Sequence, residues 1–217
     1  MVSSTCLRTA ARIAIPAAVE RVTLSAAQIA ATRIVSPLGT IAVAANSLAV
    51  TAESLCYMPG YGISAAATTL VGQSLGAGHK GRAKRFAWLS TALGMAVMGL
   101  TAVLMYAGAP WLFRILTPDA TVRALGVQVL RIEAFAEPLF AASIVAAGAL
   151  RGAGDTLVPS VLNLVSMWGV RITLAAVLAP RFGLPGVWFA MCFELCVRGV
   201  LFLVRLLRGR WLQKARL

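Results

Sequence analysis

Long apolar runs follow one another along almost the whole chain, and each is interrupted only by a short break of glycine, proline or charged residues. Hydrophobic residues make up 59% of the 217 positions and charged residues only 12%, with a mean hydropathy of +0.84. A soluble domain is about half apolar, and its core could not bury this surplus. A run of about twenty apolar residues can cross a bilayer as a helix. Because lipid offers the backbone no hydrogen-bond partner, spanning segments are helices or closed barrels, and the sequence does not contain the alternating strands of a barrel.

The breaks divide the chain into six predicted helices, which we expect to form one all-α, polytopic six-helix transmembrane bundle. Their approximate ranges are 11–35, 40–73, 86–113, 122–150, 156–179 and 185–207. The second range has about 34 positions and would reach about 50 Å, well beyond a hydrocarbon core of about 30 Å. We expect this helix to bend at "YMPGYG" (57–62), where Pro59 removes a backbone donor.

Basic residues set the predicted orientation. The chain carries 20 Lys and Arg against 7 Asp and Glu, a net charge of +13. Cytoplasmic loops are rich in Lys and Arg, so the more basic span ends are predicted to lie inside. These ends carry Arg8, Arg12, Lys80, Arg82, Lys84, Arg85, Arg151, Arg205, Arg208, Arg210, Lys214 and Arg216, and the opposite ends carry Arg33, Arg114, Arg123 and Arg181. Both termini are then cytoplasmic, in a multi-pass protein of the inner (plasma) membrane. Charge at span ends is topological, so nucleic-acid binding is not indicated.

A glycine-rich turn, "GALRGAGDT" (148–156), joins the fourth and fifth predicted helices on the cytoplasmic side. Gly152 and Gly154 can take a positive φ, and Arg151 suits the negative end of the preceding helix. Asp155 or Thr156 can cap the amides of the next helix. The stretch is predicted to be a tight structural turn.

A second cytoplasmic turn, "VGQSLGAGHKG" (71–81), follows the long helix and places Gly72, Gly76 and Gly78 at a structural turn and hinge. Gly76, Gly78 and Gly81 match the spacing GxGxxG, but a dinucleotide-binding loop follows a strand and this one follows a membrane helix. Four cysteines and the single His79 form no metal-ligand spacing. The sequence therefore predicts no metal, no cofactor and no enzyme activity.

Several blocks together resemble the multidrug and toxic compound extrusion (MATE) family of secondary transporters. They are "ATTLVGQSLGAG" (67–78) with "RAKR" (82–85), "GALRGAGDT" (148–156), "GLPGVWFAM" (183–191), "IAIPAAVERV" (13–22) and "RIVSPLGTIAVAANSLAV" (33–50). Family members carry about twelve spans in two six-helix lobes, and this chain is most similar to the second, C-terminal lobe. The resemblance implies a second lobe as partner, either a missing N-terminal half or the other subunit of a homodimer. The chain is otherwise expected to contact the lipid bilayer and small organic cations.

Acidic residues inside the spans are the candidate transport residues, because a carboxylate in lipid is costly and usually faces a cavity or a partner. Glu133 and Glu137 lie four apart on one helix face, where they could share a proton. A static ion pair with Arg131 or Arg171 is the alternative. The resemblance implies a coupling carboxylate on the first helix, for which Glu20 is the candidate. Proton or sodium coupling both stay open.

Two further acids inside the spans have other predicted roles. Asn46, Glu53 and Tyr57 lie roughly on one face of the second helix and are predicted to line a substrate cavity. Glu194 precedes Arg198 by four residues, the favourable spacing for an intrahelical ion pair. Where the sodium-type pattern of the family has a carboxylate and an amide, this chain has Phe140 and Ser143, which favours protons as the coupling ion.

The sequence thus predicts a MATE-type efflux antiporter, or half of one, that exports organic, cationic compounds in exchange for protons or sodium. A lipid-linked oligosaccharide flippase is one alternative, supported by Arg33, Arg131 and Arg171. A fragment or scaffold subunit that does not transport is the other.

Overall fold

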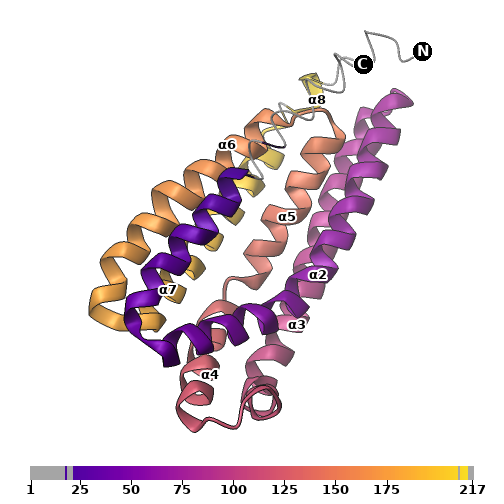
Figure 1. Ribbon diagram of the computed structural model, residues 1–217. Helices are drawn as coiled ribbons and strands as arrows, with labels where there is room; N and C mark the ends of the chain where they lie inside the picture. Colours follow the sequence, from indigo (N-terminus) through magenta and orange to yellow (C-terminus); the bar gives the residue numbers. More distant parts are fainter. Residues whose placement is uncertain (1–17, 19–21, 210, 215–217) are drawn as a thin grey trace, which may run out of the picture.

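The computed structural model describes residues 18, 22–209 and 211–214, and these residues form an all-helical bundle (Figure 1). A helix over 22–35 leads into the 3₁₀-helix η1 (Ser36–Leu38) and then into α2 (Thr40–Gly76), α3 (Lys80–Leu116), α4 (Ala120–Ala134) and α5 (Glu137–Gly152). The chain continues as α6 (Leu157–Val165), the π-helix η2 (Ser166–Ile172), α7 (Thr173–Leu207) and the short α8 (Trp211–Lys214). Three helical stretches, Thr40–Gly76, Lys80–Leu116 and Leu157–Leu207, are long and apolar enough to cross a membrane.

Helix α2 contains Pro59 in its interior and changes direction along its length, as Figure 1 shows. Beside the proline, Gly60 packs against the side chain of Met98 on α3, where a Cβ would collide with the sulfur. The turn between α2 and α3 contains Gly78 with φ 78°, a conformation that glycine adopts without steric cost. Gly76 still belongs to α2, and a Cβ on it would meet nothing within 4 Å.

The predicted helix 122–150 is wrong as one element, because the structure breaks it at residues 135–136 into α4 and α5. Pro138 stands in the first turn of α5. Proline lacks a backbone N–H and its ring collides with the carbonyl four residues earlier, which favours a break just before this position.

Helices α6, η2 and α7 form one helical hairpin, and the chain reverses within α7 at Gly183, whose φ of 62° and ψ of −145° are not helical. This reversal lies in the gap that the sequence leaves between 156–179 and 185–207. The first arm of the hairpin carries the π-helix, a one-turn irregularity that is often found at functional sites.

Helix α5 lies at the centre of the bundle, between α2 on one side and the α6–α7 hairpin on the other (Figure 1). Every residue from 141 to 150 is buried. Gly148 and Gly152 face the backbone of α2 so closely that a Cβ at either would collide with Ser64 or Thr68. The hydroxyls of these α2 residues cross the contact, because Ser64 donates to Ile144 O at 2.8 Å and Thr68 donates to Gly148 O at 2.9 Å. We call this contact the glycine seam.

The structure corrects part of the prediction made for the turn at 148–156. Gly154 takes the expected positive φ of 79°, but Gly152 stays helical and is required for close approach. Thr156 is the N-cap of α6 but makes no side-chain cap bond, and Asp155 forms an ion pair with Arg205 of α7. Gly72 also belongs to the seam, since a Cβ there would lie 3.3 Å from Gly152 O.

Two of the buried apolar regions among the described residues lie toward opposite ends of the bundle. The region at the end with the α2–α3 and α5–α6 turns includes Val71, Ala83, Leu150 and Trp211. The region toward the opposite end includes Ala49, Phe113, Leu130 and Trp188. Many large apolar side chains on the outside stay exposed, which suits a surface that faces lipid.

Candidate functional site

Three glutamates, Glu53, Glu133 and Glu137, are buried together in the apolar region toward the η1 end, and we call them the acid cluster. They come from α2, from the last turn of α4 and from the first residue of α5. Glu53 is 7% exposed, and Glu133 and Glu137 are both 0% exposed. The break at 135–136 positions the last two, because it ends one helix and begins the next between them.

The four carboxyl oxygens of Glu133 and Glu137 have no hydrogen-bond partner among the residues that the structure describes. The predicted alternative of a static pair with Arg131 is not found there. Arg131 Nε instead donates to Tyr106 O at 3.3 Å, and its guanidinium carbon lies 5.0 Å from the centroid of the Tyr106 ring. A buried ionised carboxylate without a partner is unstable, so such a group binds a proton or a cation when it can.

Glu53 interacts electrostatically with two arginines, Arg171 on η2 and Arg198 on α7, and Glu133 also interacts with Arg171, the other arginine of the predicted alternative. Glu53 also interacts with Glu133 and Glu137. Protonation or cation binding at any one of the three acids therefore changes the energy of the others. Glu20, the remaining predicted coupling residue, lies outside the described residues.

The residues of the predicted substrate stripe contact different partners in the structure, and their role in lining a substrate cavity stays a prediction. Asn46 Oδ1 accepts a hydrogen bond from Trp188 Nε1 at 3.0 Å, which ties α2 to α7. Tyr57 contacts Tyr61 and Phe140 edge to face, with ring centroids 5.7 and 5.9 Å apart. Glu53 belongs to the acid cluster. Each of the three thus has a different neighbour.

A cluster of three interacting polar side chains joins the π-helix η2 to α7. Ser166, the first residue of η2, donates to Glu194 Oε1 at 2.5 Å, and Arg198 Nε lies 3.2 Å from the same oxygen. The predicted pair of Glu194 and Arg198 is therefore present. Sequence reasoning missed Ser166 and the π-helix, because a seven-residue widening of a helix leaves no pattern in an evenly apolar segment.

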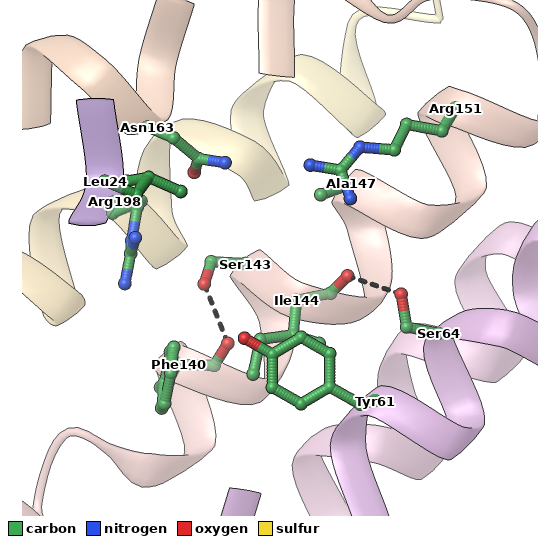
Figure 2. Close-up of a pocket in the computed structure, with 10 residues that line it drawn as sticks. All are labelled: Leu24, Tyr61, Ser64, Phe140, Ser143, Ile144, Ala147, Arg151, Asn163 and Arg198. Carbon is green, nitrogen blue, oxygen red and sulfur yellow. Dashed lines mark hydrogen bonds between the residues drawn. The ribbon is translucent and has the colours of Figure 1, made fainter. Parts of the chain in front are cut away.

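On the other side of Phe140 the bundle contains a cavity of about 350 Å³, shown in Figure 2. Its apolar wall is made by Leu24, Phe140, Ile144 and Ala147. Its polar lining is Tyr61, Ser64, Ser143, Arg151, Asn163 and Arg198. We call it the arginine cavity, because two arginines line it and, among the residues described, no acidic side chain does.

Arg151 belongs to this cavity as well as to the turn that follows. It lies at the end of α5 and reaches the cavity from one side, while Asn163 and Arg198 approach from the other, as Figure 2 shows. The sequence interpretation gave Arg151 only the role of a helix-end charge. The missed signal is its spacing from Phe140 and Ser143, which share the cavity face of α5.

Comparison with known proteins places this geometry in a family. The MatE family profile matches residues 16–177. A probable multidrug resistance protein NorM of Thermotoga maritima is 31% identical over 209 residues, which cover 94% of this chain and 44% of the relative. A protein with the same description from Brucella suis is 35% identical over 201 residues, covering 89% of this chain and 43% of the relative. The chain thus spans about half the length of the curated relatives it matches.

Solved structures share the fold. The Vibrio cholerae MATE transporter VcmN in its bent form aligns with a TM-score of 0.89 and 16% identity, over 98% of this chain and 48% of that one. The MATE transporter ClbM in complex with Rb⁺ aligns with a TM-score of 0.88 and 23% identity, over 98% of this chain and 51% of that one. Taken with relatives above 30% identity along most of its length, the profile match shows that this chain belongs to the MatE family and is a multi-pass membrane protein.

Proposed function

We propose that this chain is one lobe of a secondary transporter that exports organic cations in exchange for protons entering across the inner membrane. The observation that carries the proposal is the acid cluster, in which the buried oxygens of Glu133 and Glu137 make no hydrogen bond within the described residues. Membrane-buried acids of this kind mark ion and proton pathways. The relatives named as multidrug resistance proteins support the same activity.

The proposed mechanism couples the two ligands by competition. A proton that neutralises the acid cluster removes the negative charge that attracts an organic cation, and a bound cation disfavours protonation by the same free energy. Alternating access requires a second lobe against which this one rocks. The length of the relatives supports such a partner, and a homodimer or an N-terminal half would each supply it.

Two observations favour protons over sodium and export over lipid flipping. Sodium needs several oxygen ligands, whereas Phe140 and Ser143 stand where the resemblance expects a carboxylate and an amide. The flippase alternative rests on Arg33, Arg131 and Arg171, and Arg131 contacts Tyr106 instead of lining the arginine cavity.

Ethidium efflux from cells that express the chain tests the proposal. We expect the double variant Glu133→Gln and Glu137→Gln to lose efflux, because amides cannot bind and release the coupling proton. Asp119→Asn is the control, since it removes an acid at an exposed position outside the acid cluster and asparagine can still cap α4. Wild-type efflux by the double variant would contradict the role of the acid cluster.

The same assay separates the coupling ions. A protonophore is expected to stop efflux, whereas replacing external sodium with choline is expected to leave it unchanged. The reverse result would replace the proton by sodium. Co-purification of two differently tagged copies from the same membrane is expected if the partner lobe is a second copy of the chain, and recovery of single copies would contradict the homodimer.

A further inference from the structure

The charged side chains on the described lining of the arginine cavity are basic, whereas those of the acid cluster are acidic. Arg151 and Arg198 both line the cavity, and no acidic side chain among the described residues does. Glu194, which is fully buried, pairs with Arg198 from outside the lining, and Glu53 also interacts electrostatically with Arg198. Within the described lining, the charged groups that a ligand would meet are therefore guanidinium groups.

The hydrogen-bonding groups on the walls suit an anion. A guanidinium offers several N–H donors in a planar fork that matches a carboxylate or a phosphate. The hydroxyls of Ser64 and Ser143 donate to the backbone oxygens of Ile144 and Phe140, both at 2.8 Å. These hydroxyl protons are already used, so the other polar groups of the lining that carry donors are the two arginines, the amide of Asn163 and the hydroxyl of Tyr61.

The shape of the cavity adds an apolar requirement. Its volume of about 350 Å³ is within the range of small-molecule sites. Phe140 forms part of the wall, and the guanidinium carbon of Arg198 lies 5.5 Å from the centroid of its ring, which holds the charge beside the apolar surface. A ring or short chain would pack on this wall while its acidic group reaches the arginines.

We infer that the arginine cavity binds the carboxylate or phosphate group of an amphiphilic organic anion, through Arg151 and Arg198. This goes beyond the proposed export of cations, and it concerns a different set of residues. Binding can be measured without any ion gradient, so a failure here leaves the role of the acid cluster untouched, and a failure of efflux leaves this inference untouched.

Equilibrium dialysis of the purified chain in a non-ionic detergent, with 1-naphthoate as the probe, tests the inference. The matched probe is 1-naphthylmethylammonium, which has the same ring system and the opposite charge. We expect the protein to bind naphthoate at least about tenfold more tightly than the ammonium compound, because charge-assisted hydrogen bonds contribute at least this factor. Equal binding of the two probes would overturn the inference.

Variants then locate the site. Arg151 is exposed, so Arg151→Gln is expected to fold and to weaken naphthoate binding about tenfold. Arg151→Lys keeps the charge but loses the planar fork. Its affinity for naphthoate is therefore expected to lie between those of the wild type and Arg151→Gln. Arg85→Gln is the control, because it removes an exposed arginine outside the cavity lining. An equal loss in Arg151→Gln and Arg85→Gln, or no loss in either, would overturn the assignment.

A competition arm identifies the source of the anion. Dihexanoyl-phosphatidylglycerol, a soluble lipid with an anionic phosphate, is added to the protein with bound naphthoate. Displacement at lower concentration than by unlabelled naphthoate supports a lipid headgroup as the occupant, and weaker displacement supports a free organic anion. A lack of competition by either compound would show that the probe is bound elsewhere and would overturn the inference.

Discussion

The acid cluster and the arginine cavity share helices α2 and α5 and carry charged residues of opposite sign. Helix α2 supplies Glu53 and then, two turns later, Tyr61. Helix α5 supplies Glu137 and then Ser143 and Arg151. The acids lie in a packed apolar region, whereas the arginines line a hollow. One pair of helices can therefore hold charges of both signs, provided that their positions along the helix differ.

An aromatic layer separates the two regions. Tyr57 contacts Tyr61 and Phe140 edge to face, and along α2 and α5 these rings occupy the turns between the acids and the cavity. Arg198 bridges the layer, because it interacts with Glu53, pairs with Glu194 and lines the cavity. The difference between the regions teaches that the sign of the charge on α5 depends on the turn, with Glu137 at its start and Arg151 at its end.

The largest expected effect comes from the glycine seam, which sets the spacing of both regions. Gly152→Val places a branched side chain against the Thr68 backbone, where neither helix can give way. We expect the free energy of unfolding to fall by about 3 kcal/mol, the upper part of the range for overpacked sites. The measurement is the heating midpoint at which the buried Cys56 becomes reactive to a thiol-specific fluorophore.

Gly76→Ala is the control for the seam, because its Cβ would meet nothing within 4 Å. Its midpoint is expected to match that of the wild type or to rise slightly, since alanine favours a helix. A Gly152→Val protein as stable as Gly76→Ala would show that the two helices can separate without cost.

The second-largest expected effect distinguishes a buried glutamate with an ion-pair partner from one whose carboxyl oxygens make no hydrogen bond in the described structure. Glu194→Gln removes the charge partner of Arg198 and is expected to lower the free energy of unfolding by about 2 kcal/mol. Glu133→Gln removes a carboxyl group without a hydrogen-bond partner in the described structure, so its stability is expected to stay equal or rise. The same thiol-reactivity midpoint compares them, and the opposite order would contradict the contrast.

A smaller effect is expected when one negative charge is added to the lining of the cavity. Ser143 lines the arginine cavity and is only 4% exposed. Ser143→Asp places a carboxylate beside the arginines and is expected to reduce the preference for naphthoate over naphthylmethylammonium about tenfold. Ser143→Asn adds similar volume without charge and should keep the preference. An unchanged ratio in Ser143→Asp would show that the cavity does not select by charge.

The smallest effect is expected at the exposed end of the region that contains the acid cluster. Hydrogen bonds from the Thr121 hydroxyl, and then from the backbone N–H groups of Val122 and Thr121, hold the pKa of Asp119 below its ordinary value of 3.8. A lowered pKa in the folded state stabilises the fold above the ordinary value, and this stabilisation is lost as the pH falls below it.

Asp119→Ala is accordingly expected to lower the unfolding midpoint slightly near neutral pH, where the wild-type carboxylate caps α4. The gap between the two proteins should narrow when the measurement is repeated at about pH 3. A gap that stays constant with pH would exclude the carboxylate charge as its cause.

Sequence reasoning predicted the helical class from apolar runs, because no soluble or barrel fold accepts so many of them. It paired Glu194 with Arg198 because helix periodicity alone decides that contact. It missed the break at 135–136, since Glu133 and Glu137 were placed four apart on the face of one continuous helix. It gave Gly152 a turn role, because the need for close approach depends on Ser64 and Thr68, about 80 residues away.

The sequence by itself determined that the chain is helical and which few residues are charged within its apolar runs, because hydrophobicity and helix spacing are local properties. Only the tertiary structure decided which charges share a space. Glu53, Glu133 and Glu137 come together because α4 ends and α5 begins at one place, and Arg151 and Arg198 meet across a hollow between α5 and α7. The physical reason is that packing of distant helices, which no local pattern encodes, sets whether a buried charge finds a partner.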